Sequence, residues 1–139
     1  MKKTGIVCLV IGFLALGLLP RTVSAQANAV KIDVSFAFMV QDTKLPAGTY
    51  VITNLKDWDY RISNLKGDQK AMFTTEATTM STPAKTFTLY FNVYGDQCYL
   101  SKFFHQGKTE GYMIPQTAAE KALAQKGPVV IKTVTGKTK

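Results

Sequence analysis

The chain has 139 residues, a formal net charge of +8, one histidine and two cysteines, Cys8 and Cys98. A multi-cysteine zinc site is therefore excluded, and one histidine gives no support to a metal centre that needs three or four protein ligands. The excess of positive charge lies near the two ends of the chain, which argues against a basic, aromatic-lined groove for nucleic acid.

The N-terminus has the three zones of a secretory signal peptide. Lys2 and Lys3 precede an uncharged apolar run over residues 6–19, which is shorter than the roughly 20 residues of a membrane span. Small residues then occur at Val23-Ser24-Ala25, so we predict a signal peptide over 1–25 with cleavage after Ala25. Cleavage after Ala27 or Ala29, or an uncleaved anchor, is the alternative. The expected product is a single β domain over 26–139, exported to the periplasm or the extracellular space, with no membrane span.

The first half of this domain has the patterns of short β-strands. Residues 31–40 alternate between apolar and polar side chains, as in a half-buried strand. A polar break over 41–44 and a turn over 45–48, with Gly48 free to take a positive φ, precede a strand over 49–54. Further strands are expected over 58–65, with Trp58 facing inward, and over 71–76, followed by a loop over 78–85.

Residues 86–94 and 97–104 predict a β-hairpin, because Gly95-Asp96 suits a two-residue primed turn. The simplest register pairs Val93 with Cys98, Phe91 with Leu100, Tyr90 with Ser101, Leu89 with Lys102 and Phe87 with Phe104. One face then carries Phe104 with the other apolar residues, whereas Tyr90, Tyr94, Tyr99 and Phe103 share the second face. Because both faces carry large side chains, the second face is expected to be covered or to contact a partner.

The last part predicts a strand over 111–114, a helix and a final strand over 128–134. Thr117 and Glu120 match a helix-capping box, and Gly127 with Pro128 marks the end of the helix near Lys126. Residues 136–139 are expected to form a frayed tail. Together, 6–8 short strands and one C-terminal helix predict an all-β antiparallel sandwich or small barrel.

The aromatic second face is the candidate ligand-binding site. Tyr90, Tyr94, Tyr99 and Phe103, with Tyr112 as a further candidate, could line a groove for an apolar or sugar-like molecule or for another envelope protein. The alternative is a second layer of core, or a face covered by the late helix.

No catalytic set is recognisable in the pattern of residues. His105 lies at the expected end of the hairpin, and none of Ser35, Ser63, Ser81 and Ser101 lies in a Gly-x-Ser-x-Gly elbow. Cys98 is expected to be a buried, inert thiol. Asp57 and Asp59 flank Trp58, which suggests a sugar site, but side chains two apart on a strand share one face and are too close for a glycosidase pair. We expect no catalytic residue, metal or cofactor.

Three segments carry a resemblance to a known group of proteins. They are residues 36–40 (FAFMV), 45–52 (LPAGTYVI) and 94–100 (YGDQCYL). In order and spacing they resemble uncharacterised small exported β-domain proteins common in Acidobacteria. The resemblance covers about residues 32–120, implies an exported β domain, and carries over no catalytic residue.

The sequence therefore favours an exported, non-catalytic binding or structural module of the cell envelope. The alternative is a small hydrolase that uses carboxylates such as Asp57, Asp59, Asp96 and Glu110. A strongly raised carboxylate pKa in a cleft would favour the hydrolase over the non-catalytic module.

Overall fold

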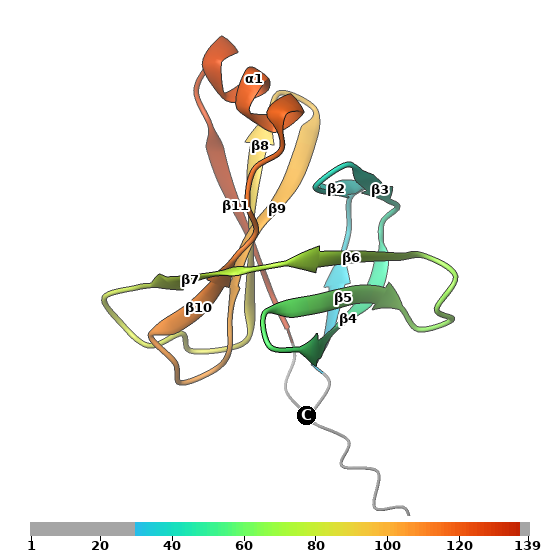
Figure 1. The fold of residues 1–139 in the computed structure, drawn as a ribbon, viewed down its shortest axis with the longest axis vertical. Helices are drawn as coiled ribbons and strands as arrows, with labels where there is room; N and C mark the ends of the chain where they lie inside the picture. Colours follow the sequence, from blue (N-terminus) through green and yellow to red (C-terminus); the bar gives the residue numbers. More distant parts are fainter. Residues whose placement is uncertain (1–29, 137–139) are drawn as a thin grey trace, which may run out of the picture.

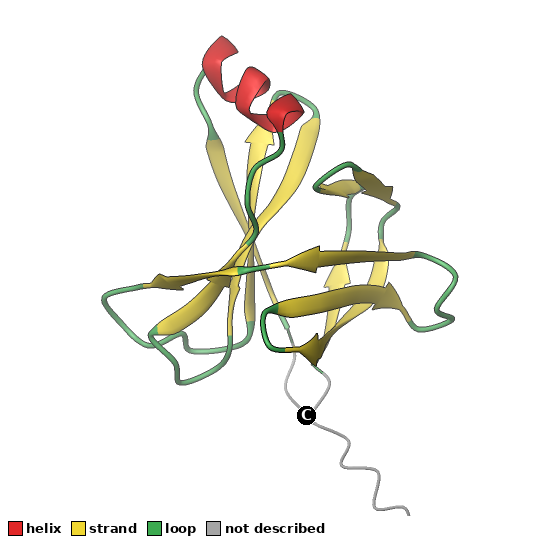
Figure 2. Cartoon of the chain, viewed as in Figure 1, coloured by secondary structure: helices red, strands yellow, loops and turns green. Residues whose placement is uncertain are grey.

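A computed structural model describes residues 30–136, which form two open β-sheets and one helix (Figures 1 and 2). The expected signal peptide lies outside the described residues. The first sheet is antiparallel and has the order β1-β4-β5-β6, with β1 Lys31–Val34, β4 Gly48–Lys56, β5 Asp59–Asn64 and β6 Lys70–Thr74. The predicted all-β sandwich with a C-terminal helix is confirmed.

The second sheet is built around the long hairpin of β8 and β9. Its order is β11-β8-β9-β10-β7, with β7 Glu76–Thr79, β8 Thr88–Tyr94, β9 Gln97–Phe104, β10 Glu110–Met113 and β11 Val130–Thr135. β2 (Phe38–Val40) pairs with β9 in parallel and with β3 (Thr43–Leu45) in antiparallel fashion. None of the helices in the described part is long and apolar enough to cross a membrane.

Within residues 30–136 the strands number eleven, rather than six to eight, because the chain changes sheets inside two of the expected strands and because β3 forms in the expected polar break. The run over 31–40 breaks at residues 35–37, so that β1 belongs to the first sheet and β2 to the second. Its alternation survives the break, since Ile32, Val34, Phe38 and Val40 are all buried. β6 and β7 are likewise separated at Thr75, and the chain also returns to the first sheet between β3 and β4, so it passes between the sheets three times within residues 30–136. The expected polar break over 41–44 contains a tight turn at Gln41 (φ 52°) and most of β3.

The core between the sheets is rich in aromatic rings. Phe38 contacts Tyr50 and Phe91 edge to face, with ring centroids 5.2 and 5.4 Å apart. The Tyr50 hydroxyl donates to the carbonyl of Pro46 at 2.6 Å, so the turn before β4 is tied to this core. Gly48 does not have the expected positive φ and instead begins β4.

The β8–β9 hairpin has the predicted turn but not the full predicted register. Gly95 has a positive φ of 62°, as the first loop position of a type II′ turn requires, and Val93 pairs with Cys98. After Phe91 and Leu100 a β-bulge shifts the register, so Tyr90 pairs with Lys102 and not with Ser101. At the bulge β9 also changes neighbours, from β2 at Tyr99 to β10 at residues 102–104.

The bulge exchanges the faces of Phe103 and Phe104. Leu89 was expected to pair with Lys102 but pairs with Phe103. Phe103 therefore lies in the core between the sheets, with no exposed surface. Phe104 pairs with Thr88, not with Phe87, and lies on the outer face against Tyr90, at a ring distance of 5.7 Å. The expected placement of Phe103 with the tyrosines is therefore wrong, because one inserted residue reverses the alternation of a strand.

The C-terminal helix α1 (Ala118–Lys126) begins and ends where predicted. Thr117 Oγ1 accepts from the N–H of Glu120 at 3.2 Å, and Gly127 follows the last turn. α1 lies across the turn end of the β8–β9 hairpin, and the chain then returns along β8 as β11 (Figure 1). Gly136, expected in the frayed tail, is buried, and its N–H donates to the carbonyl of Phe87 at 2.7 Å.

Candidate functional site

The four aromatic residues predicted to line a ligand site do not line one cavity. Phe103 is in the core, where its ring stacks on Tyr112 at 5.1 Å. Tyr94 and Tyr99 lie together, edge to face at 5.9 Å, but both are buried. Tyr90 is half-buried on the outer face of the second sheet, with the Lys102 ammonium 5.2 Å from its ring. A ligand role for these residues stays a prediction.

α1 covers Tyr94 through a buried carboxylate. The Glu120 side chain is 3% exposed, and its Oε1 accepts from Asn92 Nδ2 and the Tyr94 hydroxyl at 3.1 Å and from Gln116 Nε2 at 3.4 Å. Burial and the nearby Glu120 charge raise the pKa of Tyr94. Because Glu120 is the one fully buried side chain of α1, these bonds fix where the helix lies. The sequence indicated only the capping role of Glu120, since nothing local marks its partners on β8.

Trp58 is the most distinctive exposed residue of the first sheet. It lies in the β4–β5 turn and is 49% exposed, so the inward orientation expected for it is wrong. Its carbonyl accepts from both the N–H and the hydroxyl of Thr75, at 2.9 and 3.0 Å. The preceding Asp57 has a φ of 48°, and its carbonyl accepts from Asn54 Nδ2 at 3.0 Å. The backbone that presents the indole is therefore tied on both sides.

The exposed indole forms one wall of an open hollow. Asp57, Trp58 and Tyr112 line this hollow, whose volume is about 590 Å³, and the two ring centroids are 6.0 Å apart. Tyr112 on β10 packs inward on Tyr60 at 5.0 Å, and burial, together with Tyr112, raises the pKa of Tyr60. The hollow therefore joins the two sheets and rests on the core. We call the space that Asp57, Trp58 and Tyr112 line the Trp58 hollow.

His105 and Cys98 lie away from any reactive arrangement that the structure describes. His105 is solvent-exposed on one side and packs on Phe87 at 5.2 Å on the other, and this partial burial, with Lys108, lowers its pKa. None of the side-chain hydrogen bonds within residues 30–136 joins a serine to His105. Cys98 packs against the core opposite Val93 but is only half-buried, so the expected full burial is wrong.

The four candidate carboxylates are spread over different turns. Asp57 and Asp59 belong to the β4–β5 hairpin, where Asp59 Oδ1 accepts from Thr74 Oγ1 at 2.6 Å. Asp96 is in the β8–β9 turn, which lies near α1 in Figure 1, and Glu110 is the first residue of β10. Within residues 30–136 no group of three or more His, Cys, Asp or Glu side chains could hold a metal ion.

Comparison with known proteins gives no family on which to base a role for the Trp58 hollow. No protein-family model, no curated protein and no solved structure matches this chain.

Proposed function

We propose that this protein is an exported, non-catalytic β domain of the periplasm or the extracellular space, which binds a sugar-like ligand at the Trp58 hollow. The observation that carries this proposal is the half-exposed indole of Trp58 on a backbone tied by Thr75 and Asn54. An accessible apolar ring on a backbone that is already ordered spares the binding reaction the entropy cost of ordering that backbone.

The chemistry of the lining residues favours a sugar over a purely apolar molecule. The Trp58 and Tyr112 rings offer apolar faces on which the C–H groups of a sugar can pack, and the Asp57 carboxylate can accept hydrogen bonds from sugar hydroxyls. The volume of the hollow lies within the roughly 300–1,000 Å³ usual for small-ligand sites, but it is wide open. An open site suits one part of a longer glycan chain.

Because Trp58 is the only tryptophan, its fluorescence reports directly on the site. We expect short chito-, cello- or malto-oligosaccharides to shift the emission of the purified protein. By calorimetry, Trp58→Ala should weaken binding of the responding sugar at least tenfold, as loss of a central aromatic contact of about 2 kcal/mol predicts. Asp57→Asn, which tolerates the positive φ, should weaken it less.

Leu65→Ala is the matched control, since Leu65 is exposed on another turn of the same sheet. It should bind the sugar like the wild type. The free energy of unfolding of Trp58→Ala should lie within about 0.5 kcal/mol of the wild-type value, because Trp58 is at the surface. A response to a fatty acid but to none of the sugars would contradict the sugar proposal. Chain shortening of the oligosaccharide during the titration would favour the carboxylate-dependent hydrolase instead.

Export has its own test. Protein recovered from outside the cytoplasm should begin at Gln26, as N-terminal sequencing would show, because cleavage is expected after Ala25. Recovery with Met1 in place would contradict a cleaved signal peptide.

A further inference from the structure

The edge strand β11 is a second accessible surface, separate from the Trp58 hollow. β11 ends the second sheet and pairs only with β8 among the described strands. Val130 and Ile131 are 61% and 56% exposed, and Val129 just before the strand is also exposed. An apolar, β-branched edge of this kind attracts other strands unless something covers it.

The register of β11 shows which backbone groups are free. The N–H of Gly136 donates to the carbonyl of Phe87, one position beyond the Thr135–Thr88 pair that ends the β11–β8 register. Because hydrogen-bonded and non-hydrogen-bonded pairs alternate along an antiparallel ladder, we infer that residues 130, 132 and 134 are the ones that exchange hydrogen bonds with β8. The N–H and C=O groups of Ile131, Thr133 and Thr135 therefore point away from β8. Near Gly136 the edge meets Val30 and Lys31, whereas the side chain of Val130 at the other end is exposed.

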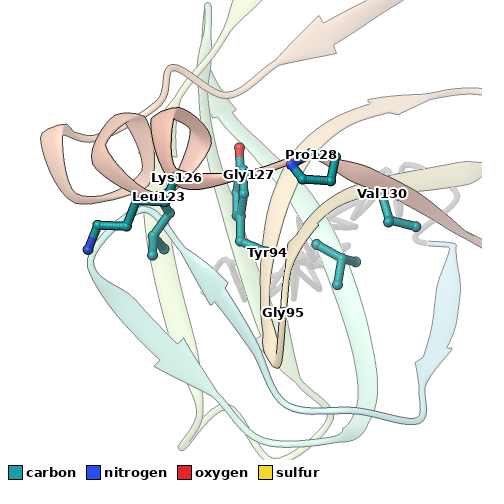
Figure 3. A pocket seen from close by; sticks show the side chains of 8 residues that line it. Tyr94, Gly95, Leu123, Lys126, Gly127, Pro128 and Val130 are labelled. Atoms are coloured by element: carbon teal, nitrogen blue, oxygen red, sulfur yellow. The ribbon is translucent and has the colours of Figure 1, made fainter.

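A hollow lies beside the open end of this edge (Figure 3). It has a volume of about 490 Å³ and lies between α1 and the beginning of β11. Its lining is mainly apolar and comes from the β8–β9 turn, from α1 and from the start of β11, with Leu123, Pro128 and Val130 among the apolar residues. A strand added along β11 would find here a place for one apolar side chain. Backbone pairing at an edge combined with a side-chain pocket is the usual arrangement for recognition by strand addition.

The charge around this edge indicates the kind of partner. Lys126 lines the hollow, Lys132 lies on β11 with its ammonium 4.0 Å from the centroid of the Phe36 ring, and residues 121–136 contain three lysines and no acidic residue. Two carboxylates lie nearby: Asp96 in the β8–β9 turn, and Glu120, which is buried and accepts from the hydroxyl of the lining residue Tyr94. A second copy of the chain fits poorly, because antiparallel pairing of two β11 strands brings their Lys132 residues opposite or diagonal to each other, where like charges repel.

We propose that β11 binds an extended, acidic segment of a partner protein, which adds to the second sheet as a strand and places one apolar side chain in the hollow beside α1. The backbone groups of Ile131 and Thr133 pair with the segment. Lys126 and Lys132 select acidic residues on it.

The probe for the test is a fluorescein-labelled octapeptide of alternating valine and glutamate, followed by fluorescence anisotropy on the purified protein. We expect saturable binding, at least tenfold tighter than that of a matched valine–lysine peptide at low salt. The charge variant Lys132→Glu should weaken binding of the acidic peptide about threefold, as expected for a partly exposed ion pair, and strengthen binding of the basic one.

Two changes test the backbone pairing. Thr133→Pro removes an outward N–H that β8 does not use and should weaken binding about tenfold, since a proline is tolerated where the N–H faces solvent. An octapeptide with N-methyl groups on alternate amides should fail to bind the unchanged protein, which keeps the test independent of how the proline variant folds. Trp58→Ala should bind the peptide like the wild type, so this result is separate from that of the sugar titration.

Three outcomes would overturn the proposal. Equal binding of the N-methylated peptide would show that no strand pairing occurs. Concentration-dependent dimers in sedimentation, abolished by Thr133→Pro, would assign the edge to a second copy. Binding to anionic phosphatidylglycerol vesicles, with no binding of the acidic peptide, would assign the lysines to a membrane surface.

Discussion

The two faces of the β8–β9 hairpin are closed in different ways. The inner face buries Leu89, Phe91 and Phe103 in the core between the sheets, where Phe91 contacts Phe38 of β2 and Phe103 contacts Tyr60 of the first sheet. The outer face near the turn buries Tyr94 and Tyr99, and α1 covers Tyr94 through the Glu120 carboxylate. Apolar area stabilises the inner face, and a few directional hydrogen bonds position the outer cover. The difference implies that α1 can separate from the hairpin more easily than the two sheets can separate from each other.

The inner face should be the more sensitive to truncation. Phe103 contacts Tyr60, Phe73, Phe87 and Tyr112. Phe103→Ala should therefore lower the free energy of unfolding by about 3–5 kcal/mol, as for other buried aromatic residues. Urea denaturation followed by circular dichroism measures this loss. Tyr90→Ala, on the outer face, is the control and should lower the free energy of unfolding clearly less. Equal losses would mean that the two faces do not differ in their sensitivity to truncation.

The bulge that separates the faces can be tested at Gly111. Gly111 lies opposite Phe104, and a Cβ on it would come within 2.5 Å of the Phe104 ring and 2.8 Å of the Phe103 carbonyl. Gly111→Ala should therefore lower the free energy of unfolding by about 3 kcal/mol, the upper end for overpacked sites, because the backbone has to move.

Gly127→Ala is the matched control for this substitution. Gly127 has an extended φ of 177°, and nothing lies within 4 Å of the added carbon. Gly127→Ala should therefore change the free energy of unfolding by no more than about 0.5 kcal/mol. If Gly111→Ala were as mild as Gly127→Ala in the same urea denaturation, Phe104 would not pack on the outer face as the bulge places it.

The outer cover should respond to loss of its carboxylate. Glu120→Ala leaves Asn92, Tyr94 and Gln116 without their common acceptor and should cost about 2 kcal/mol. Hydrogen exchange should then quicken in α1 while the β8 and β9 amides stay protected. Lys121→Ala, on the exposed side of α1, should change neither; uniform loss of protection in Glu120→Ala would mean that α1 and the sandwich unfold together.

Much of the architecture follows from local patterns. The Gly95-Asp96 turn and the Thr117 cap were predicted correctly, and the alternation over 31–40 gave the buried side chains but not the break at 35–37, because turn geometry, capping and pleat depend on a few neighbouring residues. The Val93–Cys98 pair followed for the same reason, since a two-residue turn sets the register next to it.

The candidate sites depended on contacts that no local pattern contains. Trp58 is exposed because the hairpin turn carries it past the end of the first sheet, to a corner where Thr75 binds its carbonyl. Its neighbour Tyr112 comes from β10 in the other sheet. No spacing along the chain relates these residues, so the Trp58 hollow could not be predicted from the sequence.

The sequence by itself determined an all-β domain with a capped C-terminal helix, because hydrophobic period and turn residues act over a few positions. Only the tertiary structure decided which aromatic residue lies inside. At Ser101 the strand β9 changes its neighbour from β2 to β10, and the bulge at this point turns Phe103 inward and Phe104 outward. Since alternation repeats every two residues, one unpaired residue set by a long-range contact reverses the face of every side chain beyond it.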